Sequence, residues 1–337
     1  MTGNPPADAV ASDARLRVYD FHRLRLGCFS NDSVACALEA RLGRFARCEP
    51  GPCDLHFDYR IVAQDGQRAA RVPTEDARVV YESRAGQVLY SDQSDRMFIR
   101  TVWPISADCD PVTGETTTSI VGPIDQHLWA LSHPLFTLPL IEMLKRRERY
   151  SLHAAGVARG GKGLLIPGAS GSGKSTLALA LARAGFDFLG DDMLFLENTE
   201  DGLRALAFPE SFDLTDFSVR LFPELLDLWR VERQPGWPKH ALRVDQRFGA
   251  EIAWQCRPVA LVCPRVAQSG RSTLRQMDRA EAFLELLPNV LLTEATSSQS
   301  HVAALSQLVA ECACYRLETG TDFAELAVLL GAVLERA

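Results

Sequence analysis

Short apolar runs separated by turn-forming residues dominate the first third of the chain. The runs mix β-branched and aromatic side chains with polar ones, and they cover residues 55–62, 77–81, 87–90 and 97–103. Gly, Asp and Ser gather between them, which is typical of strands joined by turns. This pattern predicts an antiparallel β-rich region over residues 16–125, preceded by a polar, disordered tail over residues 1–15.

The apolar spacing changes to a helical period farther along the chain. Helices are predicted over about residues 123–148 and within residues 280–287, 302–310 and 323–334. The apolar runs at 151–158 and 163–168 predict buried strands. We therefore expect an α/β protein whose core, over residues 126–290, contains a mixed sheet. A C-terminal helical region over residues 291–337 follows it.

A glycine-rich loop connects one of these strands to a helix. It matches the pattern G-x-x-x-x-G-K-[ST], with the apolar run at 163–168 before it and the helix-forming residues 177–184 after it. Such a loop brings successive backbone N–H groups and a helix N-terminus to a phosphate group, so it predicts nucleoside triphosphate binding. The predicted phosphate-binding residues are Gly168, Ala169, Ser170, Gly171, Ser172, Gly173, Lys174, Ser175 and Thr176.

Reactive side chains accompany this loop. Lys174 is expected to reach the β- and γ-phosphates, and the Ser175 hydroxyl to bind Mg²⁺. Two adjacent acids, Asp191 and Asp192, lie within an apolar run that predicts one strand over residues 186–197, with a polar strand end or a hairpin tip as the alternative. Buried carboxylates are costly unless a cation or hydrogen bonds compensate them. Because successive strand residues face opposite ways, one acid is expected to hold Mg²⁺ and the other to accept a proton from an attacking hydroxyl.

A histidine precedes the phosphate loop. His153 lies in the strand predicted over residues 151–158, and the turn at residues 159–162 connects that strand to the next one. This hairpin would place the imidazole near the loop, so His153 is a candidate catalytic residue. A purely structural role is the alternative, because most single histidines in a core have one.

Composition narrows the classes of function. The chain has 337 residues and a formal net charge of -7, which disfavours a broad nucleic-acid surface. Its longest apolar stretch, residues 128–144, is interrupted by His133, Pro134, Pro139 and Glu142, so we expect no membrane span. The nine cysteines lack C-x-x-C spacing, which favours buried thiols over a metal site. A cytoplasmic protein is expected.

Three segments together resemble the catalytic domain of HPr kinase/phosphorylase. They are His153–Val157, the glycine-rich loop, and Gly190 followed by the two acids. The chain is more similar still to HPr-kinase-like proteins found beside bacterial peptide-modification genes, and this nucleotide-binding core is shared with ATP-dependent phosphoenolpyruvate carboxykinase. The resemblance implies a P-loop core, ATP and Mg²⁺ as cofactors, and assembly into homo-oligomers. It also implies that Asp191 accepts the proton, that Asp192 and Ser175 lie at the metal, and that His153 lies beside the phosphates.

Departures from that family leave the acceptor open. The loop ends in Thr176 where the family has Glu, and the Glu-x-Arg-Gly-x-Gly signature after the acid pair is absent. HPr is therefore not the expected substrate. Lys239 and Arg243 are candidate contacts for substrate or γ-phosphate, with a solvent-exposed loop as the alternative. The leading function is a kinase acting on a hydroxyl of a protein, modified peptide or small molecule. A regulatory ATPase, a nucleotide-binding scaffold and a carboxykinase are the alternatives.

Overall fold

The chain forms two compact units. The computed structural model describes residues 13–62, 73–123, 127–231, 239–267 and 271–336. The first unit comprises Met1–Arg147 with Leu292–Ala295, and the second comprises Glu148–Leu291 with Thr296–Ala337. The division thus falls after the helix predicted near residues 123–148 and not before it. The predicted tail lies outside the described residues as far as residue 12.

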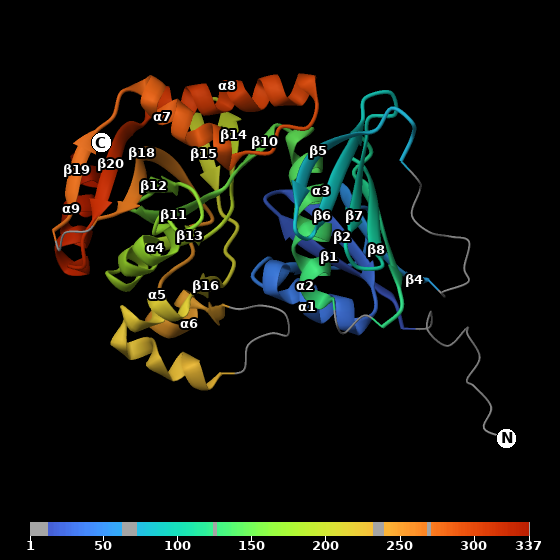
Figure 1. The fold of residues 1–337 in the computed structure, drawn as a ribbon, viewed down its shortest axis with the longest axis horizontal. Coiled ribbons are helices and arrows are strands. Elements are labelled where there is room, and N and C mark those ends of the chain that lie inside the picture. Colours follow the sequence, from blue (N-terminus) through green and yellow to red (C-terminus); the bar gives the residue numbers. More distant parts are fainter. Residues whose placement is uncertain (1–12, 63–72, 124–126, 232–238, 268–270, 337) are drawn as a thin grey trace. The chain divides into compact units, whose positions relative to one another are not determined.

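A mixed sheet forms the first unit. Its strands are β1 (Arg15–Phe21), β2 (Leu24–Ser30), β3 (Arg47–Cys48), β4 (Leu55–Val62), β5 (Arg78–Ser83), β6 (Gly86–Ser91), β7 (Arg96–Thr101), β8 (Ile105–Asp110) and β9 (Glu115–Val121). Within the described ranges they follow the order β3-β1-β2-β4-β9-β8-β7-β6-β5 (Figure 1). The prediction of an antiparallel layer was wrong at β4, which runs parallel to both β2 and β9.

Three helices belong to this unit: α1 (Asp32–Leu42), α2 (Leu128–Ser132) and α3 (Pro134–Lys145). Helix α1 was missed from the sequence, although Asn31 caps it by accepting a hydrogen bond from Val34 N. The helix predicted over residues 123–148 is split at His133, since Pro134 cannot continue the hydrogen bonding of the preceding turn.

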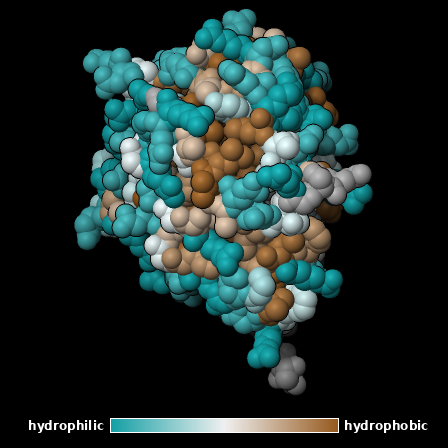
Figure 2. Space-filling view, turned by 90° about the vertical axis from the view of Figure 1, so that its left-hand side faces the viewer, coloured by the Kyte–Doolittle hydropathy of each residue, from teal (hydrophilic) through white to brown (hydrophobic). Residues whose placement is uncertain are grey.

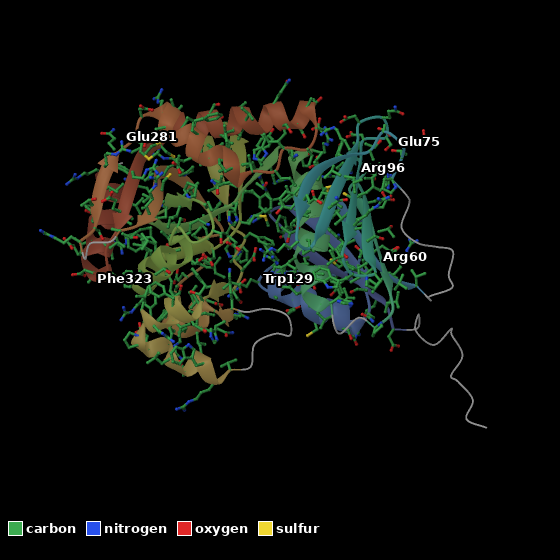
Figure 3. The ribbon with its side chains drawn as sticks, viewed as in Figure 1. Arg60, Glu75, Arg96, Trp129, Glu281 and Phe323 are labelled. Atoms are coloured by element: carbon green, nitrogen blue, oxygen red, sulfur yellow. The ribbon has the colours of Figure 1, made fainter. Side chains whose placement is uncertain are left out.

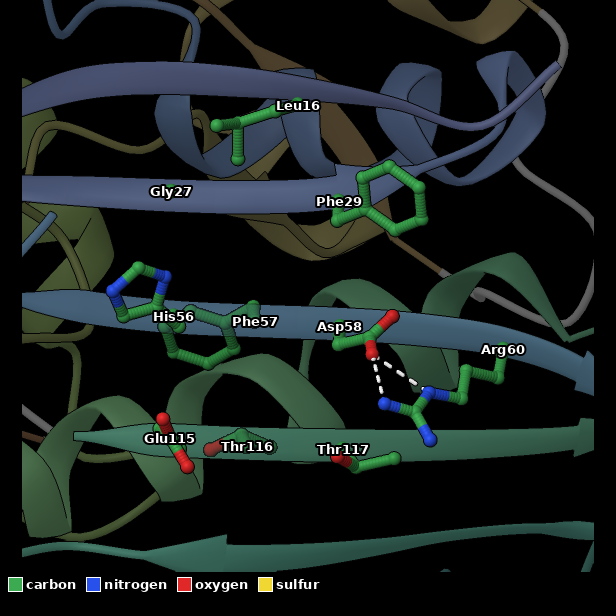
Figure 4. A pocket seen from close by; sticks show the side chains of 10 residues that line it. All are labelled: Leu16, Gly27, Phe29, His56, Phe57, Asp58, Arg60, Glu115, Thr116 and Thr117. Atoms are coloured by element: carbon green, nitrogen blue, oxygen red, sulfur yellow. Dashed lines mark hydrogen bonds and ion pairs between the residues drawn. The ribbon is translucent and has the colours of Figure 1, made fainter. Parts of the chain in front are cut away.

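The two faces of this sheet differ in polarity because strand residues alternate. Phe57 of β4 packs on Phe136 of α3, with ring centroids 4.8 Å apart. The opposite face holds a groove of about 320 Å³ in which Asp58 and Arg60 form an ion pair (Figure 4). Leu16, Gly27, Phe29, His56, Phe57, Asp58, Arg60, Glu115, Thr116 and Thr117 line it. None of the predicted phosphate-binding residues belongs to this groove.

A buried polar cluster anchors the segment Leu292–Ala295 in the first unit. Lys145 and Glu142, both within α3, are fully buried and lie 2.9 Å apart. Thr293 connects them, because its hydroxyl accepts from Lys145 Nζ at 2.7 Å and donates to Glu142 Oε2 at 2.7 Å. Each buried charge therefore has a partner, as burial requires.

Replacing Lys145 with methionine should destabilise the protein strongly, since it leaves the Glu142 carboxylate buried without its nearest cation. We expect the free energy of unfolding to fall by about 3–5 kcal/mol in chemical denaturation. The exposed pair Arg47–Glu39 provides a matched control, and Arg47→Met should cost about 0–1 kcal/mol. Equal losses in the two variants would contradict this account of the cluster.

The second unit is built around another mixed sheet. Its strands are β10 (Arg149–Leu152), β11 (Ala154–Arg159), β12 (Lys162–Pro167), β13 (Asp187–Gly190), β14 (Leu194–Thr199), β15 (Gly202–Leu206), β18 (Gln255–Val266), β19 (Thr273–Gln276) and β20 (Ala313–Thr319), with a separate ribbon of β16 (Phe212–Leu214) and β17 (His240–Leu242). Its helices are α4 (Lys174–Arg183), α5 (Asp216–Arg220), η2 (Pro223–Arg230), α6 (Val244–Phe248), α7 (Arg279–Leu286), η3 (Leu287–Asn289), α8 (Ala295–Glu311) and α9 (Phe323–Arg336).

Strand β12 is buried on both faces of this sheet, which explains its uninterrupted apolar sequence. Leu164 and Ile166 belong to the core cluster that includes residues of α4 and α9. Leu165 points the other way, into the cluster formed with α7 and α8. In the first of these layers Phe323, labelled in Figure 3, stacks on Phe222, and the ring centroids are 5.0 Å apart. The mixed α/β architecture predicted from the sequence is confirmed.

The C-terminal region is not wholly helical. Strand β20 lies within residues 291–337 and pairs in parallel with β18, so this region completes the sheet of the second unit. Short strands between amphipathic helices are easily overlooked, because a seven-residue run such as Ala313–Thr319 carries little periodicity of its own.

Apolar groups appear in patches on the surface, and most of the cysteines are buried. In the view of Figure 2, hydrophobic groups gather in patches between hydrophilic ones. Among the described residues, no helix combines the length and the apolar character needed to cross a membrane. Six of the nine cysteines are buried and all are free thiols, which fits small apolar core residues.

Candidate functional site

The glycine-rich loop lies at the carboxyl end of β12, where three parallel strands finish. Strands β12 and β20 both run parallel to β18 and flank it. A Cβ on Gly173 would lie 3.5 Å from the side chain of Val266, the last residue of β18. The carboxyl edge of parallel strands is where open α/β sheets bind ligands. The loop therefore occupies the expected ligand-binding edge.

Backbone geometry prepares this loop for an anion. Gly171 and Gly173 have φ angles of 82° and 98°, a left-handed conformation that residues with a Cβ seldom adopt. Helix α4 begins directly afterwards, with Leu177 N donating to Gly173 O at 2.9 Å. The earlier N–H groups of the first turn have no helical acceptor, and the helix dipole makes this end positive. The predicted strand, loop and helix are all present.

The side chain of Lys174 folds back over the loop that precedes it. Its Nζ donates to Gly168 O at 2.7 Å and to Ala169 O at 3.3 Å, and the residue is buried. Burial lowers the pKa of Lys174, against the opposing effects of Asp192 and Asp191. Two backbone carbonyls thus accept hydrogen bonds from an ammonium group that is poorly hydrated. An incoming phosphate would offer it a stronger, charged acceptor.

The acid pair lies in a bend between two strands, and the prediction of one continuous strand was wrong. Strand β13 ends at Gly190 and β14 begins at Leu194. The chain changes neighbours here, because β13 pairs with β11 whereas β14 pairs with β10. A side chain at Gly190 would approach the carbonyl oxygens of Met193 and Phe208 to 2.7 and 2.8 Å, so the bend requires glycine. Asp191 is buried and Asp192 is partly exposed.

The surroundings of Asp191 destabilise the ionised form of its carboxyl group. Its exposed fraction is 2%. Burial raises its pKa to about 8, and the neighbouring charge of Asp192 acts in the same direction, while a hydrogen bond from the Ser175 side chain opposes both. Its Oδ1 has no hydrogen-bond partner among the described residues. A buried carboxyl with a pKa near neutrality is typical of a group that exchanges protons.

His153 faces this bend from the next pair of strands. The strand predicted over residues 151–158 is interrupted at His153, between β10 and β11. The register on either side pairs Leu152 with Leu194 and Gly156 with Gly190, so the two interruptions lie opposite each other. The His153 side chain is exposed, yet incomplete hydration lowers its pKa, while Asp192 acts in the opposite direction through its charge and its backbone. The imidazole is therefore mainly neutral at pH 7.

The sequence-predicted site residues thus come together in the second unit. Ser175 acts on the pKa of Asp191, Asp192 acts on that of His153, and both acids act electrostatically on Lys174. Thr176, in contrast, points to the neighbouring helix, with its hydroxyl 3.2 Å from that of Ser218. Their individual catalytic and metal-binding roles remain predictions.

Sequence reasoning missed one charged group of the site. Asp213, on β16, adds to the negative potential that raises the pKa of Asp191, after burial and Asp192. The segment that contains it follows the acid pair where the resembling family has its signature, and only that position hinted at a role. Arg243, the other candidate contact for the γ-phosphate, forms an ion pair with Asp245 at 2.9 Å.

Comparison with known proteins adds little to this geometry. No protein-family model and no curated protein matches the chain. Among solved structures, the HPr(Ser) kinase/phosphatase from Coxiella burnetii aligns with 15% sequence identity and a TM-score of 0.29, over 55% of this chain and 94% of that one. At that score the two structures share too little geometry for the match to bear on function.

Proposed function

We propose that this chain is an ATP- and Mg²⁺-dependent kinase that transfers a phosphoryl group to a hydroxyl group. One observation carries the proposal: a buried lysine closes a glycine-rich loop at a helix N-terminus, and two acids, one of them buried, act on its charge. Phosphoryl transfer asks a protein mainly for positioning and charge compensation. The loop, Lys174 and the acid pair supply both.

The polar groups near the loop suit magnesium. Mg²⁺ prefers oxygen ligands, keeps several waters and is usually bound through one or two carboxylates together with substrate phosphates. Ser175 and Asp192 would supply the protein ligands, and Oδ1 of Asp191, which has no hydrogen-bond partner in the described part of the chain, is a further buried oxygen. Among the described residues, no group of three or more His, Cys, Asp or Glu is arranged to hold a metal by itself. When bound, the ion would neutralise phosphate charge.

Each residue then has one task in the reaction. Backbone N–H groups of the loop orient the phosphates, and Lys174 exchanges its carbonyl partners for phosphate oxygens. The acceptor hydroxyl gives its proton to the ionised form of Asp191 as its oxygen bonds to Pγ; this form is the minor one at pH 7 in the nucleotide-free protein, and a bound cation would favour it. The bond from Pγ to the β,γ-bridging oxygen breaks, and its electron pair leaves with ADP. Neutral His153, opposite the bend, lies beside the phosphates.

The proposal predicts acceptor-dependent phosphoryl transfer. The purified chain, incubated with Mg²⁺ and ATP labelled at the γ-phosphate, should label hydroxyl-bearing peptides from a serine- and threonine-containing array. Label should be lost when EDTA is added, because the metal is then withdrawn. Alanine-substituted peptides of the same array provide the control.

The same assay separates the kinase from its alternative. A regulatory ATPase would release labelled phosphate at the same rate with or without peptide, and no peptide would carry label. That result, or a failure to bind ATP at all, would overturn the proposed transfer activity.

A further inference from the structure

The ribbon formed by β16 and β17 places two charged residues at the loop end of α4. Its register pairs Phe212 with Leu242 and Leu214 with His240. Asp213 therefore lies on one strand of the ribbon, and Lys239 directly precedes the other. Neither residue belongs to the glycine-rich loop or to the acid pair. The two residues are distant in the sequence, and the fold brings both of them to this end of α4.

Apolar packing ties this ribbon to the core beneath the loop. Phe212 and Leu214 are completely buried in the cluster that contains Leu177 of α4. The Phe212 ring packs on Phe188 of β13, with centroids 4.8 Å apart, two residues before the strand ends at Gly190. The ribbon is thus seated on both elements that lead into the site.

Hydrogen bonds reinforce this seating close to Lys239. The Ser218 hydroxyl lies 3.2 Å from that of Thr176 and 3.1 Å from that of Thr215. His240, next to Lys239, is buried and its Nε2 lies 2.8 Å from Asp216 Oδ1. Lys239 is therefore held near the start of α4 by a rigid neighbour, although its own side chain is partly exposed.

The charge of Lys239 acts on both sides of the phosphate site. Burial is the main cause of the lowered pKa of Lys174, and the positive charge of Lys239 adds to it. The same charge contributes to lowering the pKa of His153, after burial and Lys174.

We propose that Lys239 is a further catalytic residue, which contacts the γ-phosphate of ATP as a second cation beside Lys174. The inference rests on the proposed kinase function. During transfer the γ-phosphoryl group carries negative charge on its outer oxygens, and a fixed cation there lowers the barrier. Lys239 takes no part in the proton transfer to Asp191. Its partial exposure allows it to accept a new partner when the nucleotide arrives.

The test compares nucleotides with and without a γ-phosphate. Calorimetric titration with Mg²⁺ and the non-hydrolysable analogue AMP-PNP should show a loss of affinity of about 10- to 100-fold in Lys239→Ala. Affinity for ADP should change less than about threefold, because ADP offers no γ-phosphate to this charge. Lys239→Arg should restore most of the AMP-PNP affinity, since a cation remains. Arg243→Ala, directly after β17 and paired with Asp245, is the matched control and should leave both affinities unchanged.

Each outcome decides between the two proposals. If the wild-type chain binds neither nucleotide, the proposed function fails. If it binds both and Lys239→Ala weakens them equally or not at all, the role of Lys239 is refuted while the kinase proposal stands. Thermal unfolding without nucleotide verifies that the alanine variant is folded, and Lys239→Gln replaces it in the same titration if it is not.

Discussion

Lys174→Ala should abolish ATP turnover. The variant loses the ammonium that is expected to bridge the β- and γ-phosphates, and a charge-assisted hydrogen bond of this kind contributes about 10- to 100-fold to affinity. The variant loses this interaction in the transition state as well as in the bound ground state. We therefore expect kcat/KM for ATP to fall by about 10³-fold or more. Steady-state release of ADP from the Mg²⁺–ATP complex measures the effect.

The matched control for this variant is Lys162→Ala, at the opposite end of β12, where Nζ donates to Leu334 O at 3.3 Å. It should turn over ATP at the wild-type rate. Because burial lowers the pKa of Lys174, its charge is a cost in the nucleotide-free protein, so Lys174→Met should not lower the unfolding temperature. Undiminished turnover in Lys174→Ala would refute the assignment of the phosphate loop.

Asp191→Asn should stop phosphoryl transfer while leaving nucleotide affinity nearly intact. Asparagine has the shape of the protonated carboxyl but cannot accept the proton of an attacking hydroxyl. Loss of a general base lowers rates by about 10²- to 10⁴-fold. Transfer to a hydroxyl-bearing peptide measures the rate, and AMP-PNP titration measures the affinity. Transfer at a near-normal rate would show that Asp191 is not the base.

The same variant should change how stability depends on pH. Burial raises the pKa of Asp191 from 3.8 to about 8, so the folded state binds the proton more tightly than the unfolded chain does. The stability that this provides is fully present below about pH 4 and is lost as the pH rises to about 8. Each pKa unit corresponds to about 1.4 kcal/mol, which makes the loss on the order of a few kcal/mol.

Asparagine does not titrate, so the advantage of Asp191→Asn over wild type should grow between these pH values and stay constant above them. Thermal unfolding of the nucleotide-free protein from pH 4 to pH 9 shows this directly. Asp201→Asn, at an exposed turn of the same unit, should follow the wild-type curve. Parallel curves for Asp191→Asn and wild type would mean that the carboxyl is ionised in the fold.

Both sets of effects have the same physical origin. The folded chain buries an ammonium and a carboxyl, and neither has the hydration or the full set of partners that would stabilise its charge. Such arrangements persist where function needs them and reduce the stability of the free protein. A ligand that brings phosphate and metal charge to these groups would relieve the cost, so nucleotide binding should stabilise the fold.

Local sequence determined the phosphate loop almost completely. Strand β12, the glycines at 171 and 173, and helix α4 follow from neighbouring residues, because apolar run length, left-handed glycines and helix propensity are all local properties. The α/β class and four strands of the first unit, β4, β5, β6 and β7, could be predicted for the same reason. Helix α1 could also have been found, from its Asn31 cap and the spacing of its buried residues.

Only the tertiary structure decided where the chain changes neighbours. Nothing local indicates that the runs through His153 and through Asp191 are interrupted, since each reads as one strand; the interruptions arise because β10 and β11 pair with different partners. The same holds for β20, which lies far along the chain from β18 but pairs with it. The positions of Asp213 and Lys239 beside the candidate site likewise result from long-range packing. Pairing across a sheet is a contest among distant segments, and pattern within one segment cannot report its outcome.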